Sequence, residues 1–520
     1  MQNPRMNASQ WFLSTEERGN PATRLDSRHT DSKAWSEGNL VRPLVHGSRY
    51  FEELARRVAE MRAGDLLMFA DWRGDPDERL TGLPGSEVGR VLEAASRRGV
   101  DVRGLVWRSH LDRLAFSSAE NRRLGKEINR AGGQCVLDMR VRAGGSHHQK
   151  FVVLRHPGRP ERDIAFVGGI DLGHSRRDDD EHLGDPQPQS MASVYGPRPP
   201  WHDLQVAITG PAVGDVETVF RERWEDPGAP SRSPLRWAAD VLRHDHVRTT
   251  PLPPQLPDPP PTGSSPVQLL RTYPRRLGGY PFAPVGERSV ARGYTRALGL
   301  ARHLIYVEDQ YLWSEEVSSV FARALRTNPG LRLVAVLPHY PDQDSRLAMP
   351  PSLIAREGLI DRLSSAAPGR VAFYGLENRA GTPVYVHAKV CIIDDEWASV
   401  GSDNFNRRSW THDSELTAAV CDPEFARSLR TMLAQEHLGL DGAAARSLGL
   451  GETYDAYAGA AAALQRYQDR GGTGPRPPGQ LRPLARHRHS RITRAWASAV
   501  YRGVYDPDGR PLALRHRRSM

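Results

Sequence analysis

The sequence predicts an α/β protein made of two lobes that share one order of strands and helices. Apolar, strand-like runs alternate with segments of helical periodicity along most of the 520 residues. That order returns after a Pro-rich stretch, and each half contains one His-x-Lys pair that leads into an apolar strand. The expected division is a tail, a first lobe, a Pro-rich linker, a second lobe and a basic C-terminal extension: residues 1–45, 46–226, 227–265, 266–440 and 441–520.

In the first lobe, the spacing of apolar residues separates the helices from the strands. Helical periodicity predicts helices at 50–61, 86–98, 118–131 and 212–224. Continuous apolar runs predict strands at 65–70, 101–107, 134–141, 150–154, 165–167 and 203–208. The 45 residues before this lobe are polar apart from Trp11-Phe12-Leu13, and we expect a strap or tail there.

The second lobe follows a linker whose prolines favour a semi-rigid connection, or alternatively a loop over a cleft. A short helix is possible within the linker at 235–243. After it, strands are predicted at 267–271, 304–307, 331–337, 371–374 and 416–421. Helices are predicted at 287–300, 314–326 and 352–363, and a further helix begins at Asp422-Pro423-Glu424.

Composition indicates a soluble globular chain with anionic partners. Hydrophobic residues make up 38%, the mean hydropathy is −0.57, and no run approaches the ~20 apolar residues of a membrane span. The N-terminus lacks the apolar core of a secretory signal, so a cytoplasmic location is expected, with peripheral contact to a membrane. A net charge of +9 favours membrane surfaces, phospholipids or nucleic acid. The basic cluster between Arg482 and Arg494 is either a patch for such partners or a solvated tail.

The two His-x-Lys pairs carry the chemistry. In His387-Ala-Lys389, side chains two apart on a strand lie on the same face. The imidazole can act as nucleophile or proton carrier near neutral pH, and the ammonium can hold a phosphate oxygen. A single pair would also fit a core strand with two incidental polar residues. The second pair, His148-Gln-Lys150, lies 239 residues earlier at the matching place, which favours a composite site for phosphate esters.

These motifs resemble the phospholipase D superfamily, whose signature H-x-K-x-x-x-x-D occurs twice, each time followed by a Gly-Gly or Gly-Ser turn. The turns here are Gly168-Gly169-Ile-Asp171 and Gly401-Ser402-Asp403-Asn404. Trp201-His202-Asp203 and Ile305-Tyr306-Val-Glu308-Asp-Gln310-Tyr311 are similar to the plant-type and bacterial phospholipase D branch. The resemblance implies two homologous phospholipase D-type lobes, each a mixed β-sheet flanked by helices, related by a pseudo-twofold axis.

The resemblance also implies a role for each motif residue. His148 is the expected nucleophile and His387 the general acid, with Lys150, Lys389 and Asn404 on the non-bridging oxygens. Gly168, Gly169, Asp171, Gly401 and Ser402 form the substrate-binding turns. No metal or other cofactor is expected, because the two lysines supply the positive charge.

Carboxylates complete the expected site. Glu415 and Asp178 are predicted to hold the second nitrogen of each imidazole, although Asp178 could instead belong to a solvated acidic run. Asp394 ends the second motif as a support, whereas Arg155 stands where the first motif has Asp. Asp163 is expected to compensate in part, so activity should survive.

The expected function is phosphodiester hydrolysis or head-group exchange on a glycerophospholipid at a membrane surface, giving phosphatidic acid. The alternatives are cardiolipin synthase-like phosphatidyl transfer, nuclease action of the same superfamily, and a non-catalytic membrane-binding relative. We expect a monomer without a stable nucleic-acid partner.

Overall fold

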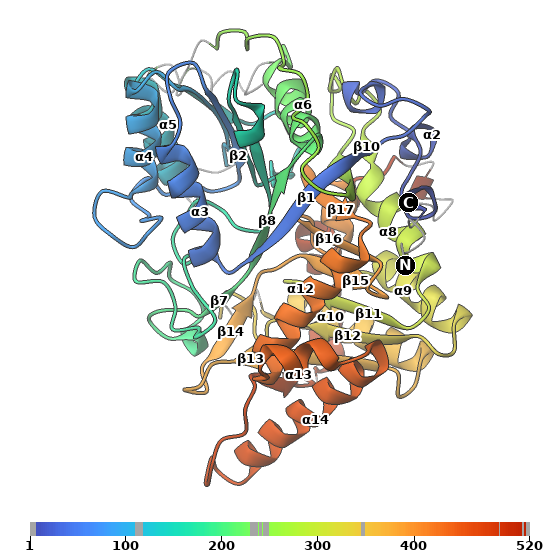
Figure 1. The fold of residues 1–520 in the computed structure, drawn as a ribbon. Coiled ribbons are helices and arrows are strands. Elements are labelled where there is room, and N and C mark those ends of the chain that lie inside the picture. The colour runs from blue at the N-terminus through green and yellow to red at the C-terminus, as the bar shows by residue number, and fades with distance from the viewer. Residues whose placement is uncertain are drawn as a thin grey trace.

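The computed structural model describes residues 7–109, 118–228, 238, 242, 249–344, 349–487, 489–511 and 514–515. Two β-sheets, each with helices on its outer face, form the body of the molecule (Figure 1). The predicted α/β architecture of two lobes is confirmed.

The first lobe contains a mixed sheet with the strand order β1–β8–β6–β5–β2–β3–β4. β2, β3 and β4 are parallel to one another, and the remaining neighbours pair antiparallel. The strands are β1 (Ser36–Val45), β2 (Leu66–Asp71), β3 (Asp101–Trp107), β4 (Gln134–Asp138), β5 (Phe151–Arg155), β6 (Ile164–Gly168) and β8 (Leu204–Thr209).

The second sheet repeats this arrangement as β9–β17–β16–β15–β11–β12–β13, with β18 added beside β13. The equivalent strands β1 and β9 pair antiparallel with each other, which is the contact that a twofold axis between the lobes produces. The strands of the second sheet are β9 (Ser265–Tyr273), β11 (Leu304–Glu308), β12 (Arg332–Val336), β13 (Val371–Glu377), β15 (Val390–Ile393), β16 (Trp397–Gly401), β17 (Glu415–Val420) and β18 (Leu481–Pro483). Short strands β7 (Trp201–His202) and β14 (Pro383–Val386) pair across the lobes, and β10 (Glu287–Arg288) pairs antiparallel with the end of β9.

Helices enclose the two sheets in layers. α3 (Gly47–Ala59), α4 (Val88–Arg97) and α5 (Ser118–Arg130) share an apolar core with the outer face of the first sheet. α8 (Ser289–Leu300), α9 (Glu315–Thr327) and α10 (Met349–Ala366) do the same for the second sheet. α6 (Ala212–Trp224) and α12 (Pro423–Leu438) pack in the core that the inner faces of both sheets share.

Strand β2 shows how the sequence directs side chains to these layers. Leu66, Met68 and Ala70 belong to the inner core, whereas Leu67 and Phe69 belong to the outer core under α3 and α4. This follows from the period of two along a strand buried on both faces.

Helix α6 is buried along its whole length although it carries several charged residues. Arg223 donates to the Asp138 carboxylate at 2.7 Å and to Ser414 Oγ of the second lobe at 3.1 Å. Glu222 accepts from Arg271 of the second lobe at 2.6 Å. Because each buried charge has a partner, the helix ties the lobes together without an uncompensated charge.

Both expected tails are integrated into the lobes. Strand β1, which falls within the predicted tail 1–45, belongs to the first sheet, and Arg18 donates to Glu287 of the second lobe at 2.7 Å. The other N-terminal elements are α1 (Ala8–Trp11), α2 (Thr15–Arg18) and η1 (Arg24–Ser27). A strand was not predicted there because β1 mixes polar and apolar residues without regular alternation.

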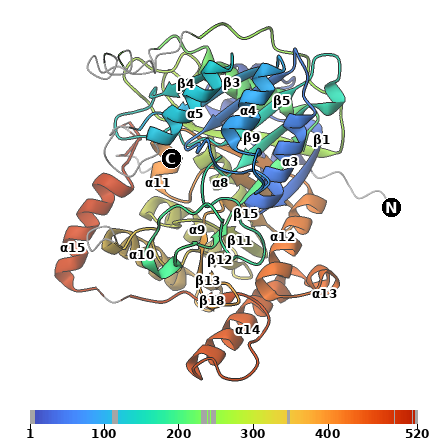
Figure 2. The ribbon, with the colours of Figure 1, turned by 90° about the vertical axis from the view of Figure 1, so that its left-hand side faces the viewer.

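The described part of the C-terminal extension forms helices and a strand that pack on the second lobe. It forms α13 (Gly442–Ser447), α14 (Leu450–Asp469), β18, α15 (Arg491–Val500) and η4 (Tyr501–Tyr505). α15 packs beside α10, and the chain then returns toward α11 (Arg407–Thr411) (Figure 2). Arg486 pairs with Asp361, and Arg510 pairs with Glu316 at 2.9 Å, so part of the basic character is neutralised.

The described part of the linker packs on the first lobe, while its expected helix 235–243 lies almost wholly outside the described residues. Thr250 accepts from Arg103 at 2.8 Å, and the Pro257 carbonyl accepts from Arg155 at 2.5 Å. Arg155 ends β5, about 16 Å along the strand from Lys150. This segment therefore lies at the opposite end of β5 from the His-Lys pair.

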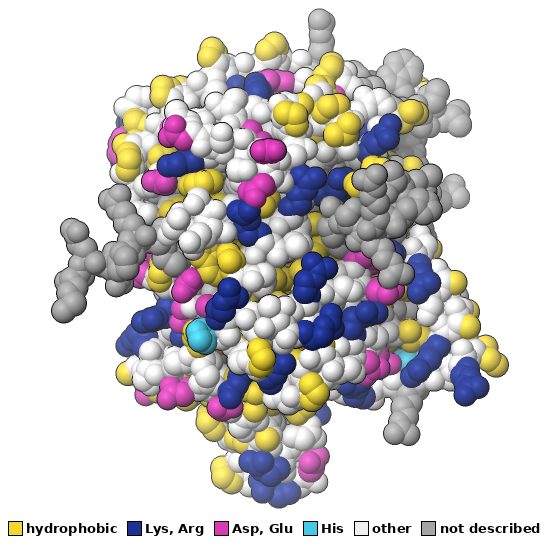
Figure 3. All heavy atoms as spheres, turned by 90° about the vertical axis from the view of Figure 1, so that its right-hand side faces the viewer, with side chains coloured by type: hydrophobic (Ala, Val, Ile, Leu, Met, Phe, Trp, Pro, Cys, Tyr) yellow, Lys and Arg dark blue, Asp and Glu magenta, His cyan; other side chains and the backbone are white. Residues whose placement is uncertain are grey.

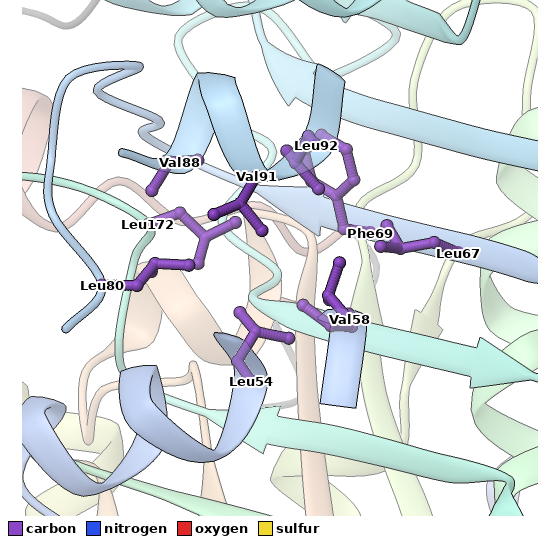
Figure 4. A pocket seen from close by; sticks show the side chains of 10 residues that line it. Leu54, Val58, Leu67, Phe69, Leu80, Val88, Val91, Leu92 and Leu172 are labelled. Carbon is purple, nitrogen blue, oxygen red and sulfur yellow. The ribbon is translucent and has the colours of Figure 1, made fainter. Parts of the chain in front are cut away.

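No helix among the described residues is long and apolar enough to cross a bilayer. A small cavity of about 10 Å³ lies under α3 and α4 in the first lobe, and the side chains around it are apolar (Figure 4). It holds at most one water-sized body, so it belongs to the core packing.

Candidate active site

His148 of the first lobe is oriented by a carboxylate of the second lobe. Its backbone N–H donates to the Ser414 carbonyl at 2.9 Å, and its Nδ1 lies 2.9 Å from Oε2 of Glu415. Glu415 is fully buried and also accepts from Ser402 Oγ at 2.6 Å. With Nδ1 held by the carboxylate, Nε2 is the nitrogen available for chemistry.

His387 of the second lobe has the reciprocal arrangement. Its backbone N–H donates to the His202 carbonyl at 2.8 Å, and its Nδ1 lies 2.6 Å from Oδ2 of Asp203. Asp203 belongs to the first lobe, is buried and directly precedes β8. Each lobe therefore supplies one imidazole and the carboxylate that orients the other lobe's imidazole.

Asp203 replaces Asp178 as the expected partner of an imidazole, and the prediction for Asp178 was wrong. The Asp178 carboxylate accepts instead from the backbone N–H groups of Trp201, at 2.8 Å, and Gly184, at 3.1 Å. It is nevertheless buried, so it does not belong to a solvated acidic run either.

The two lysines are buried and point back toward their own histidines. Lys150 Nζ donates to the His148 carbonyl at 2.9 Å and lies 3.5 Å from Oδ1 of Asp171. Lys389 Nζ donates to the His387 carbonyl and contacts Gln310 Oε1 at 3.4 Å. Strand pairing therefore places two ammonium groups beside the two imidazoles.

The glycines of the motif turns allow close approach of the neighbouring strands, and Gly169 allows close approach of the Asp203 carboxylate. A Cβ atom on Gly169 would lie 2.3 Å from Oδ1 of Asp203, and one on Gly401 would lie 1.9 Å from Oγ1 of Thr417. Gly168 would likewise meet the Leu204 carbonyl at 2.6 Å. A larger side chain at these positions would displace β8 or β17.

Asp171 and Asn404 occupy equivalent positions after these turns but differ in their surroundings. Asp171 contacts Lys150 and accepts from Arg176 at 3.2 Å, and these cations hold its pKa below the usual value although burial raises it. Asn404 is buried, and its Oδ1 has no hydrogen-bond partner among the described residues. A hydroxyl group of a substrate could donate to this oxygen, while the amide nitrogen could donate to a phosphate oxygen.

The charges of both lobes act on one site. Burial, followed by the charges of Lys389 and Arg176, holds the pKa of His387 well below its usual value, and Lys150 contributes to this. Burial also lowers the pKa of Lys389 to about 8, although the Asp203 carboxylate opposes the shift. Lys150 thus acts across the lobe boundary, as it must if both pairs face one phosphate.

Family comparisons agree with this geometry. Residues 79–250 match the family model described as phospholipase D, and residues 298–436 match the model described as cardiolipin synthase, PLD-like domain. The chain belongs to the phospholipase D superfamily.

Curated relatives include phospholipase D alpha 1 from Cynara cardunculus, 26% identical over 69% of this chain and 59% of that protein. Phospholipase D beta 1 from Arabidopsis thaliana is 26% identical over 66% of this chain and 42% of that protein. The chain thus spans about half the length of these relatives. The crystal structure of phosphatidylserine synthase from Haemophilus influenzae shares the fold, with a TM-score of 0.51 and 13% identity over 76% of this chain and 85% of that one.

The residues that end the two His-x-Lys motifs, Asp394 and Arg155, differ in their contacts. Asp394 accepts from the backbone N–H groups that begin β11: Arg302 at 2.6 Å, His303 at 2.8 Å and Leu304 at 2.8 Å. Arg155, at the equivalent place, is fully buried and donates to Asp163 at 2.8 Å and to Glu217 of α6. Asp163 therefore neutralises Arg155 and does not take over the backbone contacts of Asp394. Asp394 and Arg155 each stabilise the end of a strand at a distance from the imidazoles.

Two groups of side chains that share His202 could hold a metal ion: His202 with Glu308 and His437, and a larger group of four residues. His46, His182, His202 and Glu436 are buried or nearly so, and one ligand atom of each lies within 4.8 Å of all the others. Nδ1 of each of the three imidazoles has no hydrogen-bond partner among the described residues, and His46 and His182 have φ of 72° and 51°. Three imidazoles and a carboxylate form a ligand set suited to Zn²⁺. The cluster lies next to Asp203, because its member His202 is the residue immediately before Asp203 in the chain.

Sequence reasoning missed Asp203, Arg176 and this histidine cluster as site residues. Asp203 had a detectable signal. In each lobe, an acidic residue followed by Leu stands at the start of the strand that pairs with the strand leading into the motif turn: Asp203 just before β8, and Glu415 in β17. The cluster had none, since its three histidines and its glutamate come from four separate segments of the chain. His147, next to His148, contacts Gln149 at 3.2 Å and is not part of the cluster.

Proposed function

We propose that the protein is a phospholipase D-type phosphodiesterase that cleaves the distal phosphodiester of glycerophospholipids through a phosphohistidine intermediate. The observation that carries this proposal is the reciprocal pairing of His148 with Glu415 and of His387 with Asp203. Two imidazoles with fixed Nδ1 partners, and two lysines beside them, supply a nucleophile, a proton carrier and a place for the phosphate charge.

In the first step, Nε2 of His148 attacks phosphorus while the bond from phosphorus to the head-group oxygen breaks. His387 gives the proton on its Nε2 to the departing alcohol. Lys150, Lys389 and Asn404 hold the non-bridging oxygens, where negative charge increases in the transition state. The product is a phosphatidyl group bonded to His148.

In the second step, His387 takes a proton from water, and the hydroxyl oxygen attacks phosphorus while the phosphorus–nitrogen bond breaks. Phosphatidic acid leaves, and both imidazoles regain their starting protonation. An alcohol in place of water would give a new phosphatidyl ester by the same steps.

The charge of the substrate prepares His387 for its role. In the free protein, burial together with the charges of the lysines and Arg176 favours its neutral form, which a general acid cannot use. A phosphodiester anion between the lysines offsets their field and raises the pKa of this imidazole. Protonation of His387 would therefore accompany substrate binding.

Names of relatives support a phospholipid substrate, since several are phospholipases D. The description of the second-lobe model favours a second candidate, transfer of the phosphatidyl group to a lipid alcohol. Positive side chains on the face in Figure 3 occur in small groups with acidic side chains near them.

The test incubates the purified protein with phosphatidylcholine, phosphatidylglycerol and single-stranded DNA, alongside His387→Ala. We expect phosphatidic acid from phospholipid, and a phosphatidyl alcohol when ethanol is added. Cardiolipin formed from phosphatidylglycerol would identify the transferase instead. DNA cleavage alone would exclude the lipase, and no turnover of any substrate would leave a non-catalytic relative.

A further inference from the structure

The histidine cluster consists of His46, His182, His202 and Glu436. Each imidazole presents one nitrogen to a Glu436 oxygen: Nε2 of His46 at 2.9 Å, Nε2 of His182 at 3.0 Å and Nδ1 of His202 at 3.3 Å. The centroids of the three rings lie 5.1, 5.3 and 5.7 Å from one another. Three imidazoles bound to a tetrahedral Zn²⁺ have their centroids about 5 Å apart. The rings therefore face one centre, with the carboxylate in the place of a fourth ligand.

The carboxylates around this centre have no basic side chain as a counter-ion. Among the residues that the structure describes, the ion pairs of Glu436, Glu308 and Asp178 are made with histidines alone. Three carboxylates in the protein interior require compensating positive charge. A divalent cation bound by the three imidazoles would supply it.

His202 has a carboxylate at each of its ring nitrogens. Oε2 of Glu308 lies 2.8 Å from Nε2, and Oε1 of Glu436 lies 3.3 Å from Nδ1. A neutral imidazole carries one N–H, so it can donate to only one of these carboxylates. If that proton is on Nε2, the lone pair of Nδ1 points toward the centre of the cluster, where it can bind a metal ion.

A second cluster histidine also has a carboxylate behind it. Nδ1 of His182 lies 3.6 Å from Oδ2 of Asp178, on the side of the ring away from Glu436. Histidines that bind metals usually have a carboxylate or carbonyl at the other ring nitrogen, which fixes the ring and raises its basicity. Glu308 and Asp178 thus have the positions of carboxylates that orient metal ligands.

The backbone of the cluster holds the general acid and its carboxylate. The His46 N–H donates to the Asp203 carbonyl at 2.9 Å, and the His202 carbonyl accepts from the His387 N–H at 2.8 Å. Glu436 lies on α12 of the second lobe, whereas the three histidines belong to the first lobe. An ion in the cluster would therefore join the lobes where Asp203 meets His387.

We propose that the histidine cluster binds one Zn²⁺ ion and that this ion holds Asp203 and His387 in place across the lobe boundary. Four protein ligands leave no open position, so the ion is structural and takes no part in the phosphate chemistry. Three imidazoles among four ligands favour zinc over calcium or magnesium, which prefer oxygen ligands. Binding follows from the cluster alone, whereas the effect on catalysis rests on the proposed function.

Co²⁺ tests the ligand geometry, because it replaces Zn²⁺ and absorbs visible light strongly only in a tetrahedral site. The full chain, dialysed against a chelator and loaded with one equivalent of Co²⁺, should show this absorption, and added Zn²⁺ should remove it. His182→Asn deletes one ligand at a backbone φ of 51° that asparagine tolerates, and it should lose the absorption. Weak octahedral absorption, or no retained cobalt, in the unmutated protein would overturn the site.

His437→Asn is the matched control. His437 is fully buried next to Glu436 but belongs to the smaller group with His202 and Glu308. Its cobalt spectrum should equal that of the unmutated protein, with folding of both variants checked by circular dichroism. A spectrum that survives in His182→Asn, or that disappears in folded His437→Asn, would overturn the assignment.

Catalysis tests the positioning role. Removal of zinc should lower kcat on phosphatidylcholine about tenfold with little change in KM, because the His387–Asp203 pair loses its alignment while the lysines stay in place. Added Zn²⁺ should restore kcat in the unmutated protein but not in His182→Asn. An unchanged kcat in metal-free protein would overturn this role. If the zinc-loaded protein cleaves no phospholipid, the proposed function fails, while the cobalt spectrum still decides whether the site exists.

Discussion

The carboxylate of Asp203 in the first lobe lies 2.6 Å from Nδ1 of His387 in the second. This contact crosses the lobe boundary, as does its counterpart between Glu415 and His148 at 2.9 Å. Each motif histidine thus takes its orienting carboxylate from the other lobe. The active unit is therefore the pair of lobes.

Asp203→Asn should lower kcat on the order of 10³-fold with little change in stability, because the amide cannot hold the productive imidazole tautomer. Asp178→Asn is the matched control, since that carboxylate accepts from backbone N–H groups. Its activity should fall far less. The measurement is kcat on phosphatidylcholine for both folded variants, and similar losses would contradict the assignment.

The pH profile should decline on its alkaline side as pH rises through about 8. Lys389 has its pKa lowered to about 8, and its positive charge, needed at the phosphate, is lost above that pH. Lys389→Arg keeps its charge, so its kcat/KM should be lower but should not decline there. Lys150→Arg serves as the control and should retain the decline, and a decline in Lys389→Arg would exclude Lys389 as its source.

The covalent intermediate should form on His148. In His387→Ala, a phosphatidyl ester of p-nitrophenol, whose leaving group departs without a proton from His387, should still react with His148. Because the imidazole that activates water is missing, the phosphatidyl group should then accumulate on the protein. Rapid quenching at alkaline pH, digestion and mass spectrometry locate the modified histidine. A modified His387 in the converse variant, His148→Ala, would reverse the proposed roles.

Arg155 should matter for stability and not for chemistry. It is fully buried against Asp163 and Glu217, so Arg155→Met leaves two buried carboxylates without their cation. Loss of one partner of a buried ion pair costs about 3–5 kcal/mol. Urea denaturation should show this loss, while kcat of the folded fraction stays unchanged. Arg155→Asp, which restores the usual motif residue, should be less stable still because it adds a third carboxylate.

Zn²⁺ should bind the cluster of His46, His182, His202 and Glu436 and raise the midpoint of thermal unfolding by several degrees. Glu436→Gln removes one ligand and should abolish both the stabilisation and stoichiometric zinc uptake. His339→Gln alters a buried histidine outside the cluster and should change neither. Zinc uptake that survives Glu436→Gln would place the ion elsewhere.

The elements of each lobe follow from local patterns that the chain displays directly. The helix predicted at 212–224 and the strand predicted at 101–107 agree with α6 and β3 at both ends. Strand β1 was missed because its burial comes from pairing with β8 and β9, which are distant in sequence. Polar residues within it carry no local sign of that pairing.

The sequence by itself determined the two-lobe architecture and both His-Lys pairs, because strand periodicity and repeated motifs are local properties of the chain. It did not determine which carboxylate serves which imidazole. Asp178 and Asp203 both belong to the first lobe, yet only Asp203, which directly precedes β8, reaches His387, and Glu415 at the start of β17 reaches His148. Only tertiary packing decides such contacts, since they depend on how two sheets meet about their common axis.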